Sequence, residues 1–394
     1  MKNIIIIFCL TGIIKPEIYD VSIPENDTAS YNYADFRLWH NDSTDTLKGI
    51  YWFMHPNNGD SRNIVSDSSY QMLVDEYDFA LMGARIFNMH MDTGIGDAVI
   101  AAMDSFATLS NHDEISFLPF FINGFSWGGQ FGYHFAKWIP ERVFGFITQK
   151  GGYHDTTYAG SAIEVPGLMI VGENDMAYRI ENLTGIFLDH RPAGAKWILA
   201  MEPNAGHTLV NDQLLDNYFY SVINHRLPDD ANVFEPINLN SLNDSIGWLG
   251  DQRTYTIGSW DCYEGVFDSS SWFLSKEIGL DWQNFVSELP ADTSDCEEEL
   301  NTDYTSPINF KVHNAFPNPF NPITTIKYSI QTNGLVEAAV YNIKGRQIEK
   351  LFHGYLNKGE HSLHWNGINQ SSGIYFLELL NNHHRAIKKM ILLK

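Results

Sequence analysis

A serine flanked by glycines at two-residue spacing is the part of this sequence best suited to chemistry. The segment Gly124-Phe125-Ser126-Trp127-Gly128 fits the pattern Gly-x-Ser-x-Gly. In that pattern a sharp turn between a strand and a helix can expose a serine hydroxyl. The glycines let the two backbones approach more closely than a Cβ atom would permit. A Gly/Ser turn without any chemistry is the alternative interpretation, so the flanking sequence has to decide.

The residues on both sides of the turn have the periodicity of a strand followed by a helix. An apolar run over 115–122 predicts a buried strand before the turn. After the turn, apolar residues recur at helical spacing until Pro140 ends the pattern: Trp127, Phe131, Phe135 and Trp138. This context favours Ser126 as a nucleophile.

A serine hydroxyl is a weak nucleophile, so the hypothesis requires a base and a group that orients the base. With this type of turn they follow in the order Ser, Asp or Glu, His. Strands predicted over 166–171 and 196–200 lead into loops that carry Asp175 and His207. Both loops lie at the carboxyl ends of strands, where parallel sheets place active sites. We predict that His207 exchanges a proton with Ser126 and that Asp175 orients the imidazole.

Other residues compete for these two roles. Glu173 is an alternative acid because it lies in the same loop. Among the 15 histidines, His190 precedes its strand and His134 lies inside the helix predicted after the turn. His154 follows an earlier strand and is interpreted as part of the pocket lining. None of these three has the order and the strand position that the base requires.

Residues 31–285 resemble the α/β-hydrolase superfamily in these motifs. The resemblance is to the secreted branch that includes feruloyl and acetyl-xylan esterases and polyhydroxybutyrate depolymerases. It implies an α/β fold with a mostly parallel, doubly wound sheet, and a serine esterase that works through an acyl-enzyme. No cofactor or metal is expected, since the sequence has no P-loop, no Cys/His cluster with zinc spacing and no Gly-x-Gly-x-x-Gly turn after a strand.

The resemblance also implies an oxyanion hole made of two backbone amides. One is the amide of the residue after the nucleophile, Trp127, and the other comes from the loop after an early strand, predicted here over 49–54. Pro56 in that loop has no amide hydrogen. Asn57 or Asn58 must therefore supply the second donor, and the sequence leaves open which of them does.

The substrate itself is not fixed by the sequence. Residues beside the catalytic motifs form the candidate substrate contacts, with structural packing as an equally good interpretation of each: His55, Tyr153, His154, Met176 and Tyr178. Aromatic walls suit a phenolic ester, a sugar face or a polyester repeat equally well. One alternative function is a serine peptidase of the same fold, which would normally carry an additional specificity domain. Another is a non-catalytic surface-binding protein on a hydrolase scaffold.

The last part of the chain differs in pattern and charge from the rest. Short alternating runs such as 336–341 and 373–379 are separated by Asn-Gly, Lys-Gly and Ser-Ser-Gly turns, which is typical of a small antiparallel sandwich. Residues 309–394 contain ten Lys or Arg and four Asp or Glu, so 15 and 44 remain for residues 1–308. This change of sign indicates two separate units.

This C-terminal part resembles the sorting domain of the type IX secretion system. The matching segments are 316–322, 340–345, 359–361, 365–367, 372–376 and 389–394. The resemblance implies an immunoglobulin-like sandwich over 309–394 that is recognised by the secretion machinery. A carbohydrate-binding sandwich is the alternative interpretation.

The amino terminus agrees with export. Lys2 and the apolar run over 4–14 predict a secretory signal within residues 1–17, too short for a stable membrane span. We expect a secreted or cell-surface protein that passes through the periplasm. The hydrolase domain is predicted over 18–290, with a closing helix over 272–285, and an acidic linker over 291–308.

Charge and cysteine content set two further limits. The net charge of −23 argues against nucleic acid as a partner. Of the three cysteines, Cys9 lies in the predicted signal. Cys262 and Cys296 remain, and two thiols in an exported domain can form a disulfide, with two free thiols as the alternative.

Overall fold

A computed structural model describes residues 18–56, 59–287, 293–294, 311–312, 315, 317–330, 334–342, 346–381 and 384–394. The chain divides into two compact units, Met1–Glu297 and Glu298–Lys394. The predicted signal over 1–17 and most of the predicted linker over 291–308 lie outside the described residues.

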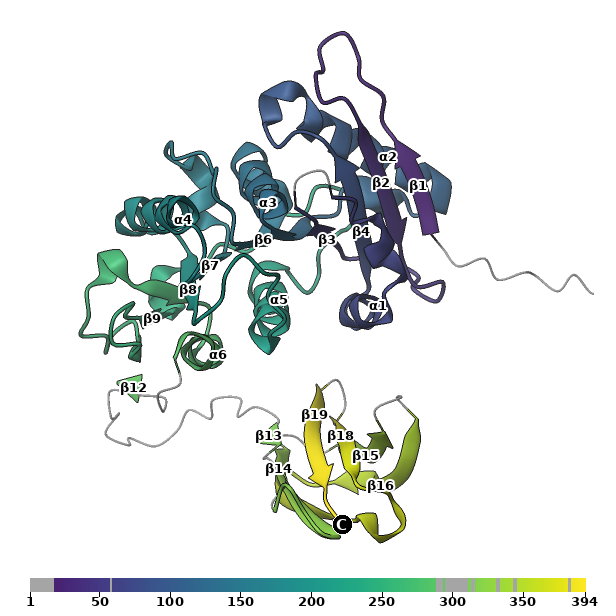
Figure 1. The fold of residues 1–394 in the computed structure, drawn as a ribbon. Coiled ribbons are helices and arrows are strands. Elements are labelled where there is room, and N and C mark those ends of the chain that lie inside the picture. The colour runs from purple at the N-terminus through teal and green to yellow at the C-terminus, as the bar shows by residue number, and fades with distance from the viewer. Residues whose placement is uncertain are drawn as a thin grey trace, which may run out of the picture. The chain divides into compact units, whose positions relative to one another are not determined.

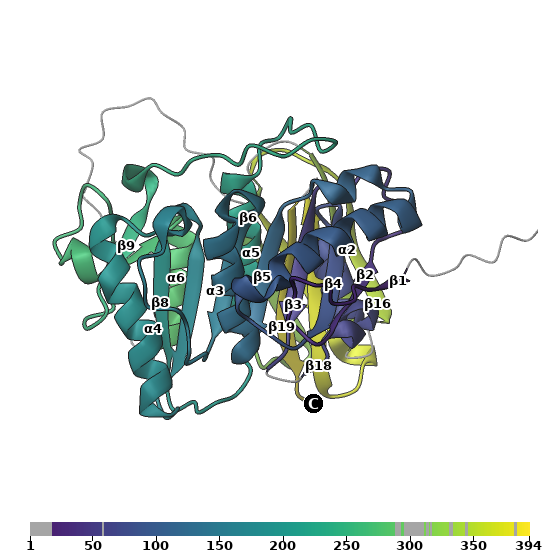
Figure 2. The same ribbon diagram turned by 90° about the horizontal axis from the view of Figure 1, so that it is seen from above.

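An eight-stranded sheet forms the centre of the first unit, and Figure 2 shows its strands side by side. The strands lie in the order β1-β2-β4-β3-β5-β6-β7-β8. Strands β3 to β8 are parallel, whereas β1 and β2 are antiparallel to their neighbours. Their bounds are β1 Ile18–Ser22, β2 Ala34–Trp39, β3 Gly49–Met54, β4 Phe79–Ile86, β5 Phe120–Phe125, β6 Val143–Gln149, β7 Gly167–Gly172 and β8 Trp197–Glu202.

Helices cover both faces of this sheet, as Figure 1 shows. The helices on one face are α2 (Ile95–Ser110), α3 (Trp127–Trp138) and α4 (Ala177–His190). Those on the other face are α1 (Ser68–Asp75), α5 (Gln213–Arg226) and α6 (Lys276–Val286). A mostly parallel sheet between two helical layers is the doubly wound architecture predicted for an α/β-hydrolase, and that part of the fold prediction is confirmed.

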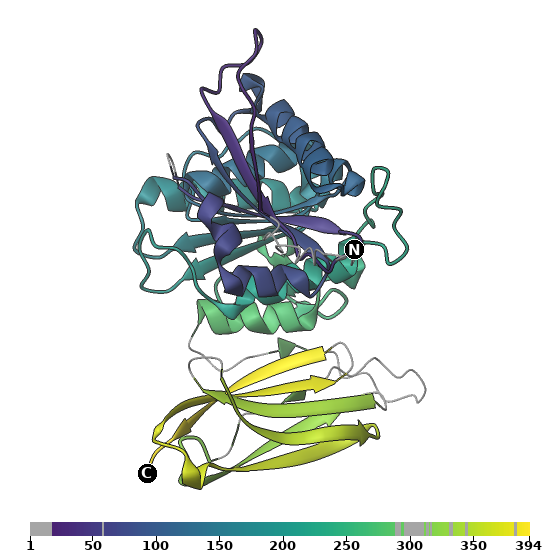
Figure 3. The same cartoon turned by 90° about the vertical axis from the view of Figure 1, so that its right-hand side faces the viewer.

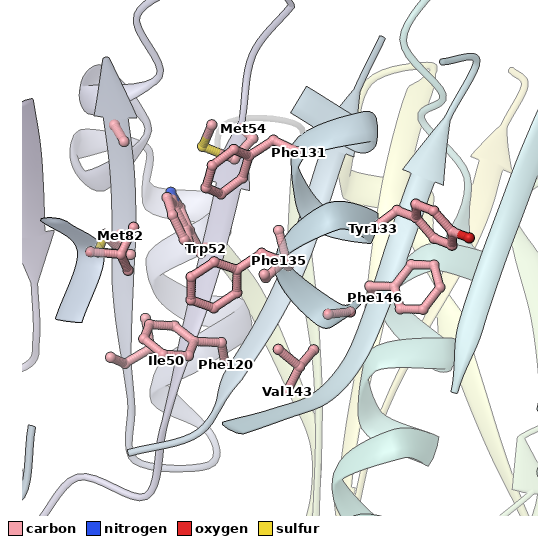
Figure 4. Close-up of a cluster of buried hydrophobic side chains, with 14 of the residues drawn as sticks. Ile50, Trp52, Met54, Met82, Phe120, Phe131, Tyr133, Phe135, Val143 and Phe146 are labelled. Atoms are coloured by element: carbon pink, nitrogen blue, oxygen red, sulfur yellow. The ribbon is translucent and has the colours of Figure 1, made fainter. Parts of the chain in front are cut away.

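The two hydrophobic cores follow from the alternation of side chains along each strand. In β3, Trp52 joins the core under α2, α3 and α4, while its neighbours Tyr51 and Phe53 join the core on the opposite face. Figure 4 shows the first of these cores, with Phe131 and Phe135 of α3 beside Trp52. Their ring centroids lie 5.1 and 5.7 Å from that of Trp52. Both phenylalanines belong to the helical pattern that the sequence predicted, and they anchor α3 to the sheet.

Two elements begin later than the sequence predicted. The run over 115–122 becomes a strand only from Phe120, because Asp113–Ser116 forms a 3₁₀ helix. In that turn the buried carboxylate of Glu114 accepts the backbone amide of Leu47 at 2.9 Å. The closing helix begins at Lys276, where the Ser275 side chain caps it, and not at residue 272.

The residues before that helix form a strand of a small second sheet. This sheet has the order β11-β9-β10-β12. Its strands are β9 (Trp248–Gly250), β10 (Ile257–Ser259), β11 (Ser271–Phe273) and β12 (Thr293–Ser294). Short 3₁₀ helices also occur at Arg62–Ser66, Met91–Thr93, Pro140–Arg142, Gly160–Glu164, Arg191–Ala193, Asp244–Ile246, Phe267–Ser269 and Gly367–Asn369.

The second unit consists of antiparallel strands, which Figure 3 shows. One sheet has the order β13-β14-β17 and the other β16-β15-β18-β19. The strands are β13 (Lys311–Val312), β14 (Ile323–Ile330), β15 (Gly334–Asn342), β16 (Gln347–Leu356), β17 (Gly359–Asn366), β18 (Gly373–Asn381) and β19 (His384–Leu392). The two sheets share one core, in which Trp365 is fully buried. The all-β prediction is confirmed, and the immunoglobulin-like arrangement stays a prediction.

Two smaller expectations concern membranes and cysteines. Within the described part of the chain, no helix combines the length and the apolar character needed to cross a bilayer.

Cys262 is disulfide-bonded. Cys296, its predicted partner, lies outside the described residues, as does Cys9.

Candidate active site

Ser126 occupies a strained turn between β5 and α3. Its backbone angles are φ 55° and ψ −120°, in a region that residues other than glycine rarely adopt. The turn is held on both sides. The Ser126 amide donates to the carbonyl of Gln149 at 2.7 Å, and the Ser126 carbonyl accepts the amides of Gly129 and Gln130 at 3.1 and 3.2 Å. The turn and the helix thus lie where the sequence predicted them, after a strand that begins later than predicted.

The glycines around Ser126 permit three backbone segments to meet. A Cβ atom at Gly124 would overlap the backbone of Gly128. A Cβ atom at Gly128 would in turn overlap the carbonyl oxygens of Met54 and His55, at the carboxyl end of β3. The first turn of α3 therefore lies directly against the loop that follows β3, and only glycine fits at this contact.

The side chains of Ser126, His207 and Asp175 form one hydrogen-bonded chain. The Ser126 Oγ lies 2.9 Å from His207 Nε2, and His207 Nδ1 lies 2.8 Å from Asp175 Oδ2. Because a carboxylate can only accept, Nδ1 carries the hydrogen of the neutral ring and Nε2 accepts from the serine hydroxyl. Asp175 follows β7 and His207 follows β8, so the carboxyl ends of β5, β7 and β8, at one edge of the sheet, supply the three groups.

The carboxylate of Asp175 is buried, with its side chain only 2% exposed, whereas His207 is 28% exposed. Burial by itself would raise the pKa of Asp175, but three hydrogen bonds outweigh it and lower that pKa below its ordinary value. The donors are the His207 ring, the Met176 amide at 2.7 Å and the Arg179 guanidinium at 2.8 Å. Asp175 is therefore an anion at neutral pH.

Glu173, the alternative acid, has a different contact. Its Oε2 accepts the backbone amide of Asn204 at 2.7 Å. This bond joins the loop after β7 to the turn that precedes His207. We therefore assign Glu173 a structural role, in which it holds these two loops together.

A buried amide side chain links the nucleophile strand to the histidine loop. Gln149, the last residue of β6, accepts the backbone amide of Val210 at 2.9 Å and donates to Asn123 of β5 at 2.7 Å. Asn123 in turn donates to the Tyr51 hydroxyl at 2.8 Å. The ring of Phe125 packs on His207 with a centroid distance of 4.9 Å. Sequence reasoning missed these supports.

A buried lysine holds the same loop from the other side. Lys150 has a left-handed φ of 54° and a side chain that is 0% exposed. Its ammonium donates to the Thr208 carbonyl at 2.8 Å and forms an ion pair with Glu202 of β8. Thr208 is the neighbour of His207, so Lys150 fixes the backbone next to the base. A lysine directly after a strand gave no signal of this role in the sequence.

The backbone amide of Trp127 can donate to a ligand because of its place at the start of a helix. Trp127 is the first residue of α3, and the first amides of a helix have no acceptor within the helix. The helix start also carries a partial positive charge that favours an anion. The second predicted donor, Asn57 or Asn58, lies outside the described residues. His55 at the start of that loop is partly buried, and burial lowers its pKa, with Asp60 opposing this effect.

The predicted substrate contacts divide into exposed and buried residues. Tyr153, Met176 and Tyr178 are 65%, 59% and 36% exposed, and the two tyrosine rings lie 5.2 Å apart. Tyr153 also lines a cavity of about 470 Å³ together with Trp138. These side chains give the acid side of the site an exposed aromatic surface.

His154, by contrast, is buried among other side chains. It is only 4% exposed, Thr148 Oγ1 lies 2.8 Å from its Nε2, and its Nδ1 lies 3.1 Å from Asn182 Oδ1. Burial lowers its pKa to about 3. This environment does not support the predicted pocket-lining role, and we assign His154 a structural role.

The other two competing histidines are also engaged within the fold. His134 Nε2 accepts the Asp155 amide at 2.9 Å, and burial lowers the pKa of His134 to about 4. His190 Nε2 accepts the Ala159 amide at 3.0 Å. No group of three or more His, Cys, Asp or Glu side chains that could hold a metal ion occurs in the residues that the structure covers.

Comparisons with known proteins separate the two units. The family model for a secretion system C-terminal sorting domain matches residues 314–393. This match indicates export by type IX secretion to the cell surface or outside. No curated protein matches the chain.

Several solved structures are similar to part of the chain. The serine hydrolase FphF of Staphylococcus aureus is 12% identical with a TM-score of 0.39, covering 52% of this chain and 98% of its own. The LpqC poly(3-hydroxybutyrate) depolymerase of Bordetella parapertussis is 12% identical with a TM-score of 0.40, covering 56% and 93%. A dienelactone hydrolase of Anabaena variabilis is 16% identical with a TM-score of 0.38, covering 53% and 98%.

Proposed function

We propose that this chain is an exported serine hydrolase that cleaves carboxylic esters with Ser126, His207 and Asp175. The observation that carries the proposal is the hydrogen-bonded chain from the strained serine to a buried carboxylate. Ser126 Oγ lies 2.9 Å from His207 Nε2, and His207 Nδ1 lies 2.8 Å from Asp175 Oδ2. Nucleophile, base and orienting acid in this geometry are the parts that acyl transfer requires.

In the first half of the reaction, the Ser126 Oγ attacks the ester carbonyl carbon while His207 Nε2 takes the hydroxyl proton. Negative charge then develops on the carbonyl oxygen, and the Trp127 amide and an amide of Asn57 or Asn58 donate to it. When the tetrahedral intermediate collapses, the C–O bond to the alcohol breaks. His207 returns the proton to the departing alcohol, and the acyl group stays on the serine.

The second half repeats these steps with water. His207 takes a proton from a water molecule, the hydroxyl attacks the acyl-enzyme carbonyl carbon, and the bond to the Ser126 Oγ breaks. The serine regains its proton from His207, and the carboxylic acid is released. In both halves Asp175 remains ionised and stabilises the imidazolium.

The exposed side chains beside the site bear on the substrate. Tyr153 and Tyr178 present aromatic surface close to the acid loop, and Met176 adds an apolar side chain. Such a surface suits a sugar, phenolic or polyester face, and export gives the enzyme access to polymers outside the cell. We therefore place plant polysaccharide esters and polyesters among the proposed substrates.

A substrate screen tests this function. The exported protein is assayed on p-nitrophenyl esters of graded chain length, on feruloylated and acetylated xylan, and on a polyester film. We expect turnover of activated short-chain esters and of at least one polymer. Absence of turnover on every ester would reject the esterase proposal.

A further inference from the structure

Arg179 contacts the proposed catalytic acid from within the first turn of α4. Its Nη1 lies 2.8 Å from Asp175 Oδ1, four residues earlier in the chain. The side chain is 19% exposed, and its guanidinium carbon lies 5.0 Å from the centre of the Tyr178 ring. On the other side, a Cβ atom at Gly152 would lie 2.5 Å from Arg179 Cγ. The arginine is therefore packed in one position.

The two oxygens of the Asp175 carboxylate have separate partners. Oδ1 accepts the Met176 amide and the Arg179 guanidinium, at 2.7 and 2.8 Å. Oδ2 faces His207 Nδ1 at 2.8 Å. Rotation of the carboxylate out of this plane would break both bonds to Oδ1, so these two donors hold the second oxygen toward the imidazole.

Other charged groups around His207 have partners of their own. Lys150 at the end of β6 pairs with Glu202 of β8. Glu173, in the acid loop, accepts the Asn204 amide, and Asp212 caps the start of α5. Among the described residues, Arg179 is thus the cation that directly contacts the triad carboxylate.

We propose that Arg179 is a positioning residue of the triad: it holds the Asp175 carboxylate in the orientation that faces His207 Nδ1. The proposal rests on the proposed esterase function. If the guanidinium is removed, the Met176 amide remains as a donor to Oδ1, and the carboxylate can turn away from the imidazole. The ring then loses the partner that fixes its tautomer and orientation.

The first test measures kcat and KM on a soluble ester for Arg179→Met and Arg179→Lys. In R179M we expect kcat to fall about tenfold with an unchanged KM, because the carboxylate can rotate while the substrate surface stays intact. R179K keeps a cationic donor, so we expect it to recover part of the lost kcat. An unchanged kcat in R179M, or an equal loss of kcat in both variants, would overturn the proposal.

A matched control comes from a strand near the other edge of the sheet. Arg37 of β2 also pairs with an aspartate, Asp20, through two hydrogen bonds of 2.8 and 2.9 Å. Four strands separate β2 from β7. Arg37→Met removes the same kind of ion pair, and we expect it to leave kcat and KM unchanged.

A second readout needs no substrate. Nuclear magnetic resonance at a fixed pH follows the Nδ1 proton of His207, which lies in the hydrogen bond to Asp175, with the signal assigned by its loss in His207→Gln. We expect this signal to move upfield or to broaden in R179M, because the hydrogen bond loosens, and to stay in place in R37M. If R179M does not fold, Arg179→Gln replaces it with the same expectation. An unmoved signal rejects the role of Arg179, whereas an inactive wild-type enzyme rejects only the esterase function.

Discussion

His207 Nε2 lies 2.9 Å from Ser126 Oγ although 81 residues separate the two in sequence. The parallel sheet makes this possible because the carboxyl ends of β5 and β8 lie at the same edge. The contact is then fixed locally. The Ser126 amide donates to the Gln149 backbone, and the Gln149 side chain accepts the Val210 amide in the histidine loop.

Ser126→Ala removes the proposed nucleophile. We expect kcat on short-chain esters to fall on the order of 10⁶-fold, as for other triads. Because alanine is smaller and leaves the backbone bonds intact, we expect an unchanged circular dichroism spectrum. A variant that keeps more than a few per cent of the activity would remove Ser126 from the mechanism.

Gly128→Ala tests the close contact between α3 and the loop after β3. The added Cβ would overlap the carbonyl oxygens of Met54 and His55, so we expect a loss of about 3 kcal/mol in the free energy of unfolding. Urea unfolding measures this loss. Gly185→Ala in α4 is the matched control, since a Cβ there meets no atom within 4 Å. We expect that variant to be more stable by about 0.5–1 kcal/mol, and equal effects of the two substitutions would contradict the packing argument.

The buried histidines make the fold sensitive to acid. Burial lowers the pKa of His154 to about 3 and that of His134 to about 4, whereas both titrate near 6.5 in the unfolded chain. The unfolded chain therefore binds more protons below pH 6.5, so stability is complete above that pH and falls as the pH drops toward 4 and 3. We expect a loss of about 2 kcal/mol for each histidine between pH 7 and pH 5.

Urea unfolding at pH 7 and pH 5 measures this loss. His154→Gln should remove its share of the pH dependence, although the variant is less stable at pH 7. His225→Gln on α5 is the control and should keep the full dependence. Equal stability of the wild type at both pH values would show that these histidines are not neutral in the fold. Asp175 also contributes to the loss of stability in acid. Because its pKa is lowered in the fold, its hydrogen bonds stabilise the fold only while the carboxylate is ionised.

How much of this could be predicted from the sequence depends on the range of the interactions. The turn at Ser126 is visible because its glycines and its helical pattern are local. Asp175 and His207 could be proposed because a parallel sheet limits where loop residues can meet. Their roles stay predictions that the variants above will test.

The supporting residues could not be predicted in this way. Gln149 and Lys150 act through long side chains that reach a different loop, and no local pattern reports such a contact. His154 follows a strand just as a site residue would, yet its ring lies inward. The strand predicted from residue 115 begins later because an apolar run does not distinguish a strand from a buried 3₁₀ turn.

Removal of the C-terminal unit tests the separation of the two functions. Every proposed catalytic residue precedes position 210, so we expect a chain that ends at Thr305 to fold and to keep its kcat on soluble esters. In a host with the matching secretion system, the same chain should remain in the periplasm. Normal export together with loss of binding to insoluble polysaccharide would contradict the sorting role and favour a binding module.

The two attachments of Gln149 have a mechanical consequence. Its backbone carbonyl holds the serine turn and its side chain holds the histidine loop. A substitution that displaces this one residue would therefore disturb the nucleophile and the base together. The geometry of proton transfer thus depends on a residue that lies outside the triad.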